Sequence, residues 1–349
     1  MLTRNLSISF LLGLAAVGCA ADVSSPDDPN DPGPGPDEPL PADIDATGKY
    51  SMRSNFDLAA NAPGKAGDVA RMFIDATDEG DDPSKWILEQ VINALPSGTF
   101  KNVLNGAKPF VAGIINQRLL DIAPDFVTTM VAIGNDVGEV SKNFGLNETL
   151  EVSGSTGSYT AVHTVTGAHF KINNVESDYA FADFATDNVA VSGVTLTLDE
   201  TGKVTLADHK VGLAYGKVIR IALDGAIIPS LDPAASNLGQ LLQSQVNCQA
   251  VGQAINDAVV STIGFGPGAG TFASACTAGL TAGANLIYSK IADIDGSALE
   301  FGLTGTAKML DKNNDKKLDT IQTGSWAGNL SYAGTPAPLA NATFFGARM

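Results

Sequence analysis

The longest hydrophobic pattern in the chain covers residues 109–144. Its apolar positions recur at steps of three and four residues, the spacing that places side chains on one face of an α-helix. They are Val111, Ile115, Leu119, Ile122, Phe126, Met130, Ile133, Val137, Val140 and Phe144. A continuous helix of about 36 residues would be roughly 54 Å long. Because Pro124 lies inside it, we expect a kink near residues 121–124.

Strand-like alternation follows this helix. Over residues 148–223 apolar and polar positions alternate, which predicts an antiparallel meander of about five or six strands. The phase of the alternation shifts at Ser192 and Gly193, which indicates a β-bulge. The last strand of the meander, residues 217–223, would place Ile219, Ile221 and Leu223 on its inner face. Further strands are predicted near residues 48–59, 299–310, 321–332 and 341–348.

Two helices joined by a glycine-rich loop are predicted for residues 232–290. The first begins at Asp232-Pro233, and the second runs from Phe272 to about Lys290. The connecting sequence GFGPGAG has the glycine content of a phosphate-binding loop, but it follows no strand and lacks a Gly-Lys-Ser/Thr ending. We therefore predict a helical hairpin. The fold class that results is α+β: a long kinked amphipathic helix packed on a curved antiparallel sheet, with an additional helical hairpin.

The N-terminal residues have the order of an export signal. A positive charge at Arg4 precedes an apolar run over residues 8–17, which is too short to cross a bilayer as a stop-transfer helix. The sequence Ala16-Val17-Gly18-Cys19 resembles the bacterial lipobox, with Ala16 where Leu is usual. The resemblance implies a signal peptide over residues 1–18 and a mature protein that begins at a diacylglyceryl- and palmitate-modified Cys19.

By this resemblance the protein is a lipoprotein of the bacterial cell envelope. In bacterial lipoproteins an Asp directly after the modified cysteine commonly holds the protein at the inner membrane, and here Ala20 and Ala21 follow Cys19. We therefore expect attachment to the outer membrane through the lipid. The alternative is an ordinary secretory signal that is cut near Ala20 or Ala21.

Residues 19–47 predict an extended tether. From Asp22 onward this segment holds eight acidic residues, no basic residue and seven prolines. It buries too little apolar surface to fold, and proline together with like charges keeps it extended. At up to about 3.1 Å per residue it would reach roughly 80 Å from the anchor. The remaining residues, 48–349, are long enough for one or two domains, and we predict a single α+β domain.

Charge and cysteine content narrow the chemistry further. The net charge is −17 at pH 7, which argues against nucleic-acid binding by phosphate neutralisation and against attraction to an anionic membrane surface. If Cys19 is acylated, Cys248 and Cys276 remain as an even pair in an oxidising compartment, so we expect a disulfide. It would stabilise the fold by roughly 3 to 4 kcal/mol.

One polar stretch resembles a calcium loop. Asp311, Asn313 and Asp315 place oxygen ligands at alternate positions, and Asp319 adds a fourth, as in the first part of an EF-hand-like or dockerin-like loop. Lys316 replaces the usual glycine of that loop, and Gln322 stands where a bidentate Glu is usual. Two interpretations remain: a weak Ca²⁺ site, or a polar hairpin loop without a metal. No other cofactor is predicted.

No catalytic motif is found. None of His163, His169 and His209 has a Cys, Ser or carboxylate at a spacing that predicts a triad, and the chain has no Gly-x-Ser-x-Gly or His-Glu-x-x-His. Because triads are assembled in space, this lowers the odds of an enzyme without excluding one. The acids between Asp178 and Asp187 could form a glycosidase-like pair, but they are explained more simply as solvated strand positions. We predict that the protein is not an enzyme.

Two features together resemble the tubular lipid-binding family that includes the bactericidal/permeability-increasing protein. They are the long amphipathic helix beside a curved sheet and a later helix with a cysteine, Ser244-Gln245-Val246-Asn247-Cys248-Gln249-Ala250-Val251. In that family the partner cysteine precedes this helix, whereas Cys276 follows it here. The resemblance implies a groove for acyl chains between helix and sheet, lined by Phe126, Met130, Ile133 and Phe144.

Two hypotheses for function follow. In the first, the protein is an outer-membrane surface lipoprotein of structural or interaction type, whose helix stripe is solid core. In the second, it carries a hydrophobic ligand, an acyl chain or lipid, between the long helix and the sheet. A carrier needs a continuous apolar cavity of several hundred Å³, whereas a structural module is packed to normal interior density. We prefer the first hypothesis, because the apolar face of a helix more often packs into a filled core than lines a cavity.

Overall fold

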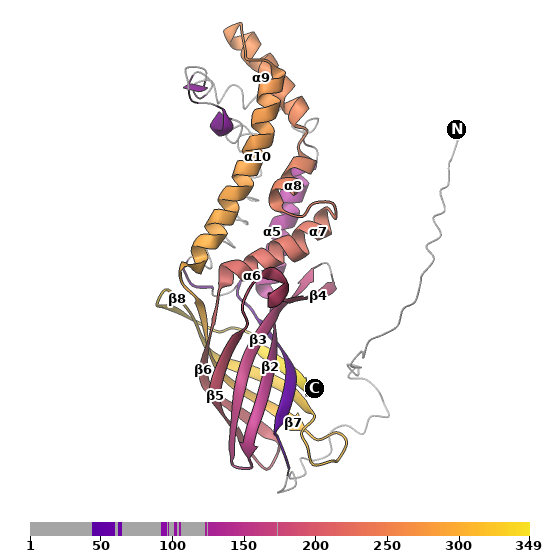
Figure 1. The fold of residues 1–349 in the computed structure, drawn as a ribbon, viewed down its shortest axis with the longest axis vertical. Coiled ribbons are helices and arrows are strands. Elements are labelled where there is room, and N and C mark those ends of the chain that lie inside the picture. Colours follow the sequence, from indigo (N-terminus) through magenta and orange to yellow (C-terminus); the bar gives the residue numbers. More distant parts are fainter. Residues whose placement is uncertain are drawn as a thin grey trace, which may run out of the picture. The chain divides into compact units, whose positions relative to one another are not determined.

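Eight antiparallel strands close into a barrel in the structure, a computed structural model (Figure 1). In spatial order they are β10 (Thr343–Arg348), β1 (Gly48–Phe56), β2 (Phe144–Ser155), β3 (Ser158–Ile172), β5 (Val189–Leu198), β6 (Lys203–Leu213), β7 (Leu299–Leu310) and β8 (Thr320–Tyr332). Strand β10 closes the ring because it pairs with both β1 and β8. Two short strands pair outside the ring, β4 (Val175–Ala180) with β3 and β9 (Thr335–Pro338) with β8. The structure describes residues 44–59, 62–64, 92–95, 97, 101–102, 105, 123, 125–172 and 174–349, which all belong to the unit Pro39–Met349.

Alternation along the strands fills the barrel with apolar side chains. Successive side chains of a strand point to opposite faces, and most inward positions are buried and apolar: Tyr50, Met52, Phe56, Leu150, Val152, Tyr159, Leu196, Leu206, Phe301, Leu303, Met309, Ile321 and Leu330. Outward positions are mainly Thr, Ser, Asn, Lys and Glu. A barrel of about eight strands is just wide enough for side chains to fill it. The barrel interior is therefore a packed core.

The expectation of a long kinked helix on a curved sheet is wrong. The described helix, α5, covers only Phe126–Lys142, and its C-cap is Asn143. Phe144 continued the helical spacing, but it is the first inward residue of β2. The first half of the expected helix, residues 109–122, lies outside the described residues, as does Pro124 with the expected kink.

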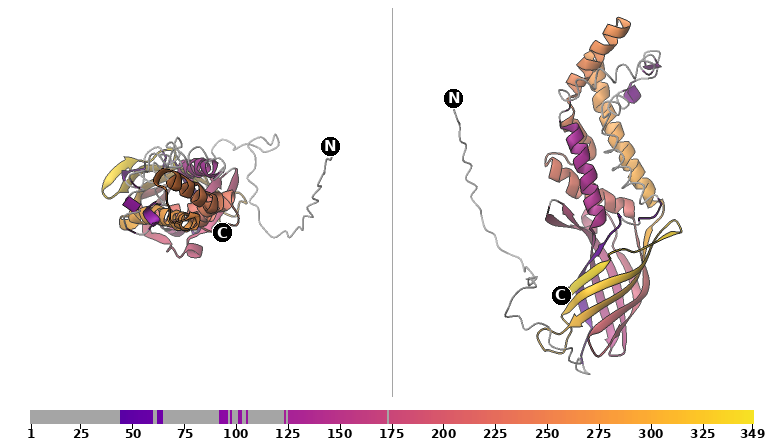
Figure 2. Two further views of the ribbon diagram at one scale, coloured as in Figure 1. Left: turned by 90° about the horizontal axis from the view of Figure 1, so that it is seen from above. Right: turned by 180° about the vertical axis from the view of Figure 1, so that it is seen from behind.

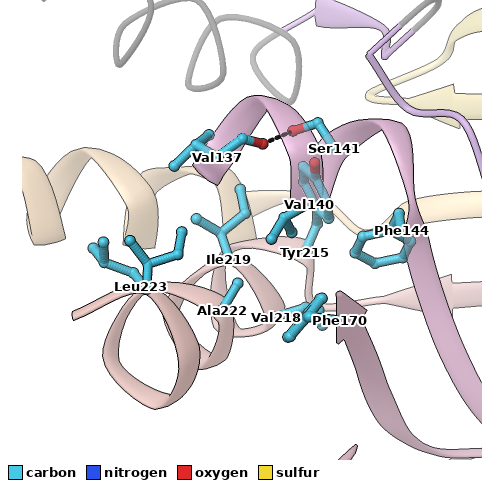
Figure 3. A pocket seen from close by; sticks show the side chains of 11 residues that line it. Val137, Val140, Ser141, Phe144, Phe170, Tyr215, Val218, Ile219, Ala222 and Leu223 are labelled. Atoms are coloured by element: carbon cyan, nitrogen blue, oxygen red, sulfur yellow. Dashed lines mark hydrogen bonds between the residues drawn. The ribbon is translucent and has the colours of Figure 1, made fainter. Parts of the chain in front are cut away.

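The sheet closes on itself and does not wrap a helix. Hydrophobic alternation shows which face of a strand is buried, but not which strands pair, so the contact of β10 with β8 could not be inferred from it. Among the described residues the ring encloses side chains of its own strands, and α5 packs against one end of the barrel, where Val137 and Val140 line a pocket together with Phe144 (Figure 3).

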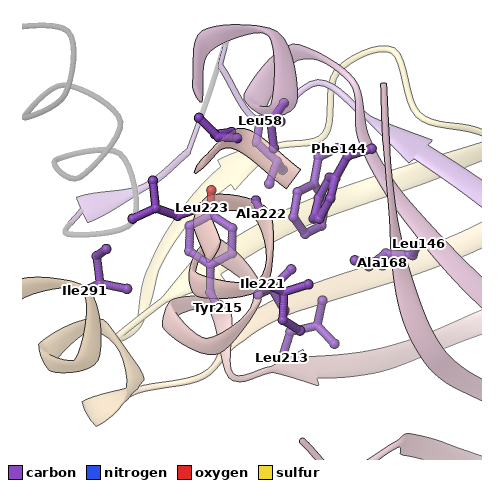
Figure 4. Packing of buried hydrophobic residues seen from close by; sticks show 14 of the residues in the cluster. Leu58, Phe144, Leu146, Ala168, Leu213, Tyr215, Ile221, Ala222, Leu223 and Ile291 are labelled. Atoms are coloured by element: carbon purple, nitrogen blue, oxygen red, sulfur yellow. The ribbon is translucent and has the colours of Figure 1, made fainter. Parts of the chain in front are cut away.

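One helical run lies across the same end of the barrel. It comprises α6 (Tyr215–Ile221), the π-helical turn η2 (Ala222–Ile227) and α7 (Ile228–Leu231). Tyr215, Val218 and Ile221 are buried against the barrel core (Figure 4). The predicted strand over residues 217–223 is therefore wrong. Apart from Lys217 and Arg220 every residue there is apolar, so the segment fits a period of two and a helical period equally well.

The next helices form a disulfide-linked hairpin. Helices α8 (Leu238–Gln245) and α9 (Cys248–Ile263) each begin with an Asn N-cap, since Asn237 accepts from Gln240 N and Asn247 from Ala250 N, both at 3.0 Å. These caps divide what the sequence pattern predicted as one long helix. Helix α10 (Ala269–Ala292) follows the glycine-rich loop, and the 3₁₀ turn η3 (Asp293–Gly296) leads into β7. Figures 1 and 2 show the helices together at one end of the barrel.

Two close contacts hold α9 against α10. Cys248 and Cys276 are joined by a disulfide with a Cα–Cα distance of 5.5 Å. One turn later, Gly252 lies so close to α10 that a Cβ there would be 2.5 Å from Ala269 O and 2.6 Å from Ala273 N. The disulfide and the close contact at Gly252 therefore hold α9 against α10 along the same face.

Several elements agree with the sequence predictions. Strands β1, β7, β8 and β10 lie where alternation placed them, and residues 264–268 form the turn of a helical hairpin. The bulge in β5 is also confirmed. Val194 pairs with Ala161 and Val191 with His163, so Ser192 and Gly193 are inserted opposite one residue of β3. Gly193 has φ of 75° there, which glycine adopts without strain.

Candidate functional site

Five polar side chains from five strands meet inside the barrel. They are Ser54, Glu148, His163, His209 and Trp326, all buried, and we call them the barrel network. Trp326 Nε1–H donates to Ser54 Oγ at 2.9 Å, and the Ser54 hydroxyl donates to Glu148 Oε2 at 2.5 Å. On the other side of the carboxylate, Glu148 Oε1 lies 3.4 Å from His163 Nε2. His163 Nδ1 in turn lies 2.9 Å from His209 Nε2.

The backbone at His209 fixes where the protons of the barrel network lie. His209 Nδ1 is 2.8 Å from the carbonyl oxygen of Ala207, which can only accept, so Nδ1 carries a proton. In neutral His209 the other nitrogen accepts, and His163 Nδ1 donates to it. Glu148 Oε1 and His163 Nε2 face each other at 3.4 Å without a hydrogen bond, and they are the two atoms of the barrel network that lack one.

Burial favours the neutral form of the His209 imidazole. Desolvation is the largest influence on His209 and lowers its pKa, helped by the neighbouring His163. The hydrogen bond to Ala207 and the carboxylates of Glu148 and Asp208 act in the opposite direction without cancelling the effect. His163 is 0% exposed and stacks on Trp326, with ring centroids 5.7 Å apart. A substrate therefore does not reach these rings, and we assign the barrel network a structural role.

This cluster was not predicted from the sequence. His163 was placed correctly in a strand, but no spacing along the chain joins five residues from five strands. The signal that could have found it is the alternation itself. Ser54, Glu148, His163 and His209 occupy inward positions that are otherwise apolar, and buried polar groups require partners.

An apolar pocket lies where α5 meets the helical run that covers the barrel end (Figure 3). Its lining comes from α5, β2, β3, α6 and η2: Val137, Val140, Ser141, Phe144, Phe170, Tyr215, Val218, Ile219, Ala222, Leu223 and Ile227. The Ser141 hydroxyl donates to Val137 O of its own helix at 2.7 Å. The cavity measures about 20 Å³, room for about one water molecule. Binding sites for small molecules are an order of magnitude larger, about 300–1,000 Å³.

The four predicted groove residues do not all line this pocket. Phe144 lines it, whereas Phe126 and Ile133 are buried elsewhere in the core, and the side chain of Met130 lies outside the described residues. Most of the other lining residues come from α6 and η2, where residues 217–223 had been interpreted as a strand.

In the predicted calcium loop, the side-chain oxygens bind backbone amides. Asp311 accepts from Asp315 N at 3.3 Å and from Lys316 N at 2.8 Å. Asn313 accepts from Asp315 N at 3.0 Å, and Asp319 from Lys312 N at 2.9 Å. Lys316 has φ of 67°, the left-handed conformation that glycine would take in such a loop. Among the described residues no three His, Cys, Asp or Glu side chains converge as metal ligands, and calcium binding stays a prediction.

The helices of residues 233–289, which we call the arm, have an unusual surface. Between Asp232 and Lys290 the only charged residue is Asp257, although charged residues make up 17% of the chain. Within the arm, that is up to residue 289, the exposed side chains of α10 are Thr, Ser, Ala, Asn and Leu286. The strands, by contrast, carry Lys and Glu on the outer face of the barrel, such as Lys210 and Glu300, 3.7 Å apart. The arm therefore offers neighbours a neutral, weakly polar surface.

Comparison with protein families, with curated proteins and with solved structures finds no match for this chain. In the described part of the chain, no helix combines the length and the apolar character needed to cross a bilayer. The lipobox and Cys19 lie outside the described residues, so lipidation stays a prediction.

Proposed function

We propose that the protein is a lipid-anchored interaction protein of the bacterial outer membrane, in which the barrel is a solid support and the arm makes the contacts. The observation that carries this proposal is the single charged residue among residues 233–289. Solvent-exposed faces of an acidic protein ordinarily hold charges that keep neighbours apart. A surface that lacks them can be covered by a partner without desolvating charge.

The packed barrel supports a role in which it holds the arm toward a partner and binds no ligand itself. A carrier would hold its ligand in the barrel or beneath the helices, but the barrel is filled and the pocket at its end is about 20 Å³. The acid–base groups of the barrel network are enclosed, so we propose no catalysis. The predicted tether after Cys19 would allow the folded part to move over roughly 80 Å while it stays attached to the membrane.

Covering of the arm can be measured in the cell envelope. Ser261 near the end of α9 and Thr195 on the outer wall of the barrel are both exposed. Each is replaced in turn by cysteine, Ser261→Cys or Thr195→Cys, and labelled with a soluble maleimide in broken envelopes and after detergent extraction. Cys248 and Cys276 are paired and Cys19 is expected to be acylated, so the new thiol alone should react.

We expect labelling of Ser261→Cys to be several-fold slower in envelopes than in detergent, with no such difference for Thr195→Cys. Equal rates at Ser261→Cys in both states would contradict the proposal. The anchor is tested separately by Cys19→Ser, which should abolish incorporation of labelled palmitate and release the protein from the membrane fraction.

The apolar lining of the pocket favours the carrier as the second candidate, with Phe144 among its lining residues. To hold a lipid, the pocket would have to widen. The π-helical turn η2, which supplies part of the lining, would then have to move away from α5. Native mass spectrometry of protein from its own host, followed by organic extraction, distinguishes the two. A clean protein mass agrees with the interaction protein, whereas a stoichiometric lipid would replace it with the carrier.

A further inference from the structure

The end of the arm exposes apolar side chains on a turn shaped by glycine. We call residues 259–270 the tip. Gly264 ends α9 with φ of 88°, and Gly268 precedes α10 with φ of 94°, conformations that other residues adopt only under strain. Between them Phe265 is 68% exposed, and Val260 one turn earlier is 41% exposed. A Cβ built on Gly264, Gly268 or Gly270 would meet no atom within 4 Å, so none of the described residues packs on these three glycines.

The tip is held in position by the contacts at its base. The disulfide between Cys248 and Cys276 and the close approach of Gly252 to Ala273 fix α9 against α10. The turn folds back on α9, since a Cβ on Gly266 would lie 3.4 Å from Val260. The hairpin that carries Phe265 is thus already ordered. Little conformational entropy is therefore lost when a partner covers this side chain.

No charge has to be desolvated when the tip is buried. Residues 258–289 contain no Asp, Glu, Lys, Arg or His, and the nearest charged residue before them is Asp257, whose carboxylate accepts from Gln253 Nε2 at 2.7 Å. The large apolar side chains exposed on the described part of the tip are Phe265 and Val260, whereas a stable protein interface uses roughly 20–30 residues on each side. The acyl chains of a lipid bilayer, by contrast, can surround a single apolar side chain without a large or complementary contact surface.

We propose that the tip inserts into the interfacial layer of a lipid bilayer, with Phe265 and Val260 entering among the acyl chains and Asp257 remaining in the water. The proposal rests on the arm as the contact element and names its partner. Because the protein has a net charge of −17, attraction to anionic headgroups does not contribute, and the interaction is with neutral lipid and insensitive to salt.

Vesicle flotation tests the proposal. The full chain carrying Cys19→Ser, which has no acyl anchor, is mixed with phosphatidylcholine vesicles at low and high salt. We expect it to float with the vesicles at both salt concentrations, and Phe265→Asp to reduce the partition coefficient at least tenfold. The matched control is Phe345→Asp, since Phe345 is 57% exposed on the outer face of β10, and it should leave flotation unchanged. Phe265→Trp should show blue-shifted emission that brominated lipids quench, and Phe345→Trp should show neither.

The outcomes separate this proposal from the one on which it rests. Flotation that does not depend on Phe265, or no flotation at all, overturns insertion of the tip. If Ser261→Cys is nevertheless protected in envelopes, the arm is a contact element with a different partner, a protein. If Ser261→Cys is not protected, the arm is free in the envelope, and the proposed function fails together with this inference.

Discussion

A buried polar atom inside an apolar barrel needs a hydrogen-bond partner. In the barrel network Trp326 donates to Ser54 and Ser54 to Glu148, while His163 bonds His209, which donates to the carbonyl of Ala207. Only Glu148 Oε1 and His163 Nε2, 3.4 Å apart, lack such a bond within the network. A buried donor or acceptor left unpaired costs about 1–3 kcal/mol. The network therefore constrains which strands lie next to one another more than it adds to stability.

The first prediction concerns pH. Burial lowers the pKa of His209 in the folded protein, so the unfolded chain, with an imidazole pKa of about 6.5, binds a proton that the folded protein does not. The contribution of His209 to the free energy of unfolding is therefore fully present above about pH 6.5 and is lost as the pH falls below it. The loss is up to about 1.4 kcal/mol for each pH unit, until the folded ring also takes up a proton.

Urea unfolding of the wild-type protein and of His209→Gln at pH 7.5 and 5.5 checks this prediction. The loss of unfolding free energy between the two pH values should be smaller in the variant by about 1 kcal/mol. The same substitution at His169, on the outer face of β3, shows whether any histidine gives this result. An unchanged pH dependence in His209→Gln would mean that the ring is not held neutral in the folded state.

At the scale of elements, the sequence predicted strands and turns better than the way they assemble. Alternation placed β1, β7, β8, β10 and the bulge at Gly193 correctly, because an inward apolar position repeats every second residue whatever the partner strand. It failed at residues 217–223, where the apolar residues between and after Lys217 and Arg220 fit either period. It also failed at residues 143–144, where Phe144 matched a helical stripe although the helix had ended. Alternation could show that the polar residues of the barrel network face inward, but not that they contact one another, because those contacts depend on which strands are neighbours.

The second prediction tests how tightly α9 and α10 pack. A Cβ on Gly252 would lie 2.5 and 2.6 Å from backbone atoms of α10, which cannot move aside as a side chain can. We expect Gly252→Ala to destabilise the protein by about 1–3 kcal/mol, measured by thermal or urea unfolding. Gly270→Ala is the matched control, since nothing lies within 4 Å of its Cβ and alanine favours a helix by up to about 1 kcal/mol. Equal effects of the two substitutions would argue against the close packing.

At the scale of the whole molecule, the fold depends on strand β10. It is the last strand of the chain, and its hydrogen bonds to β1 on one side and β8 on the other turn a sheet with two free edges into a closed ring. Phe344 points inward and its ring stacks on Trp326, with centroids 4.2 Å apart, which also ties the closing strand to the barrel network. Phe345, the next residue, points outward.

The third prediction follows from this alternation. Because side chains of a strand alternate, a shift of β10 by one residue would exchange the environments of Phe344 and Phe345. Phe344 is 2% exposed and Phe345 57%, so Phe344→Ala should lower the free energy of unfolding by about 3–5 kcal/mol, and Phe345→Ala should change it by less than about 0.5 kcal/mol. Urea unfolding followed by circular dichroism measures both. Reversed magnitudes would place β10 in the other register, and two small effects would mean that β10 does not close the barrel in solution.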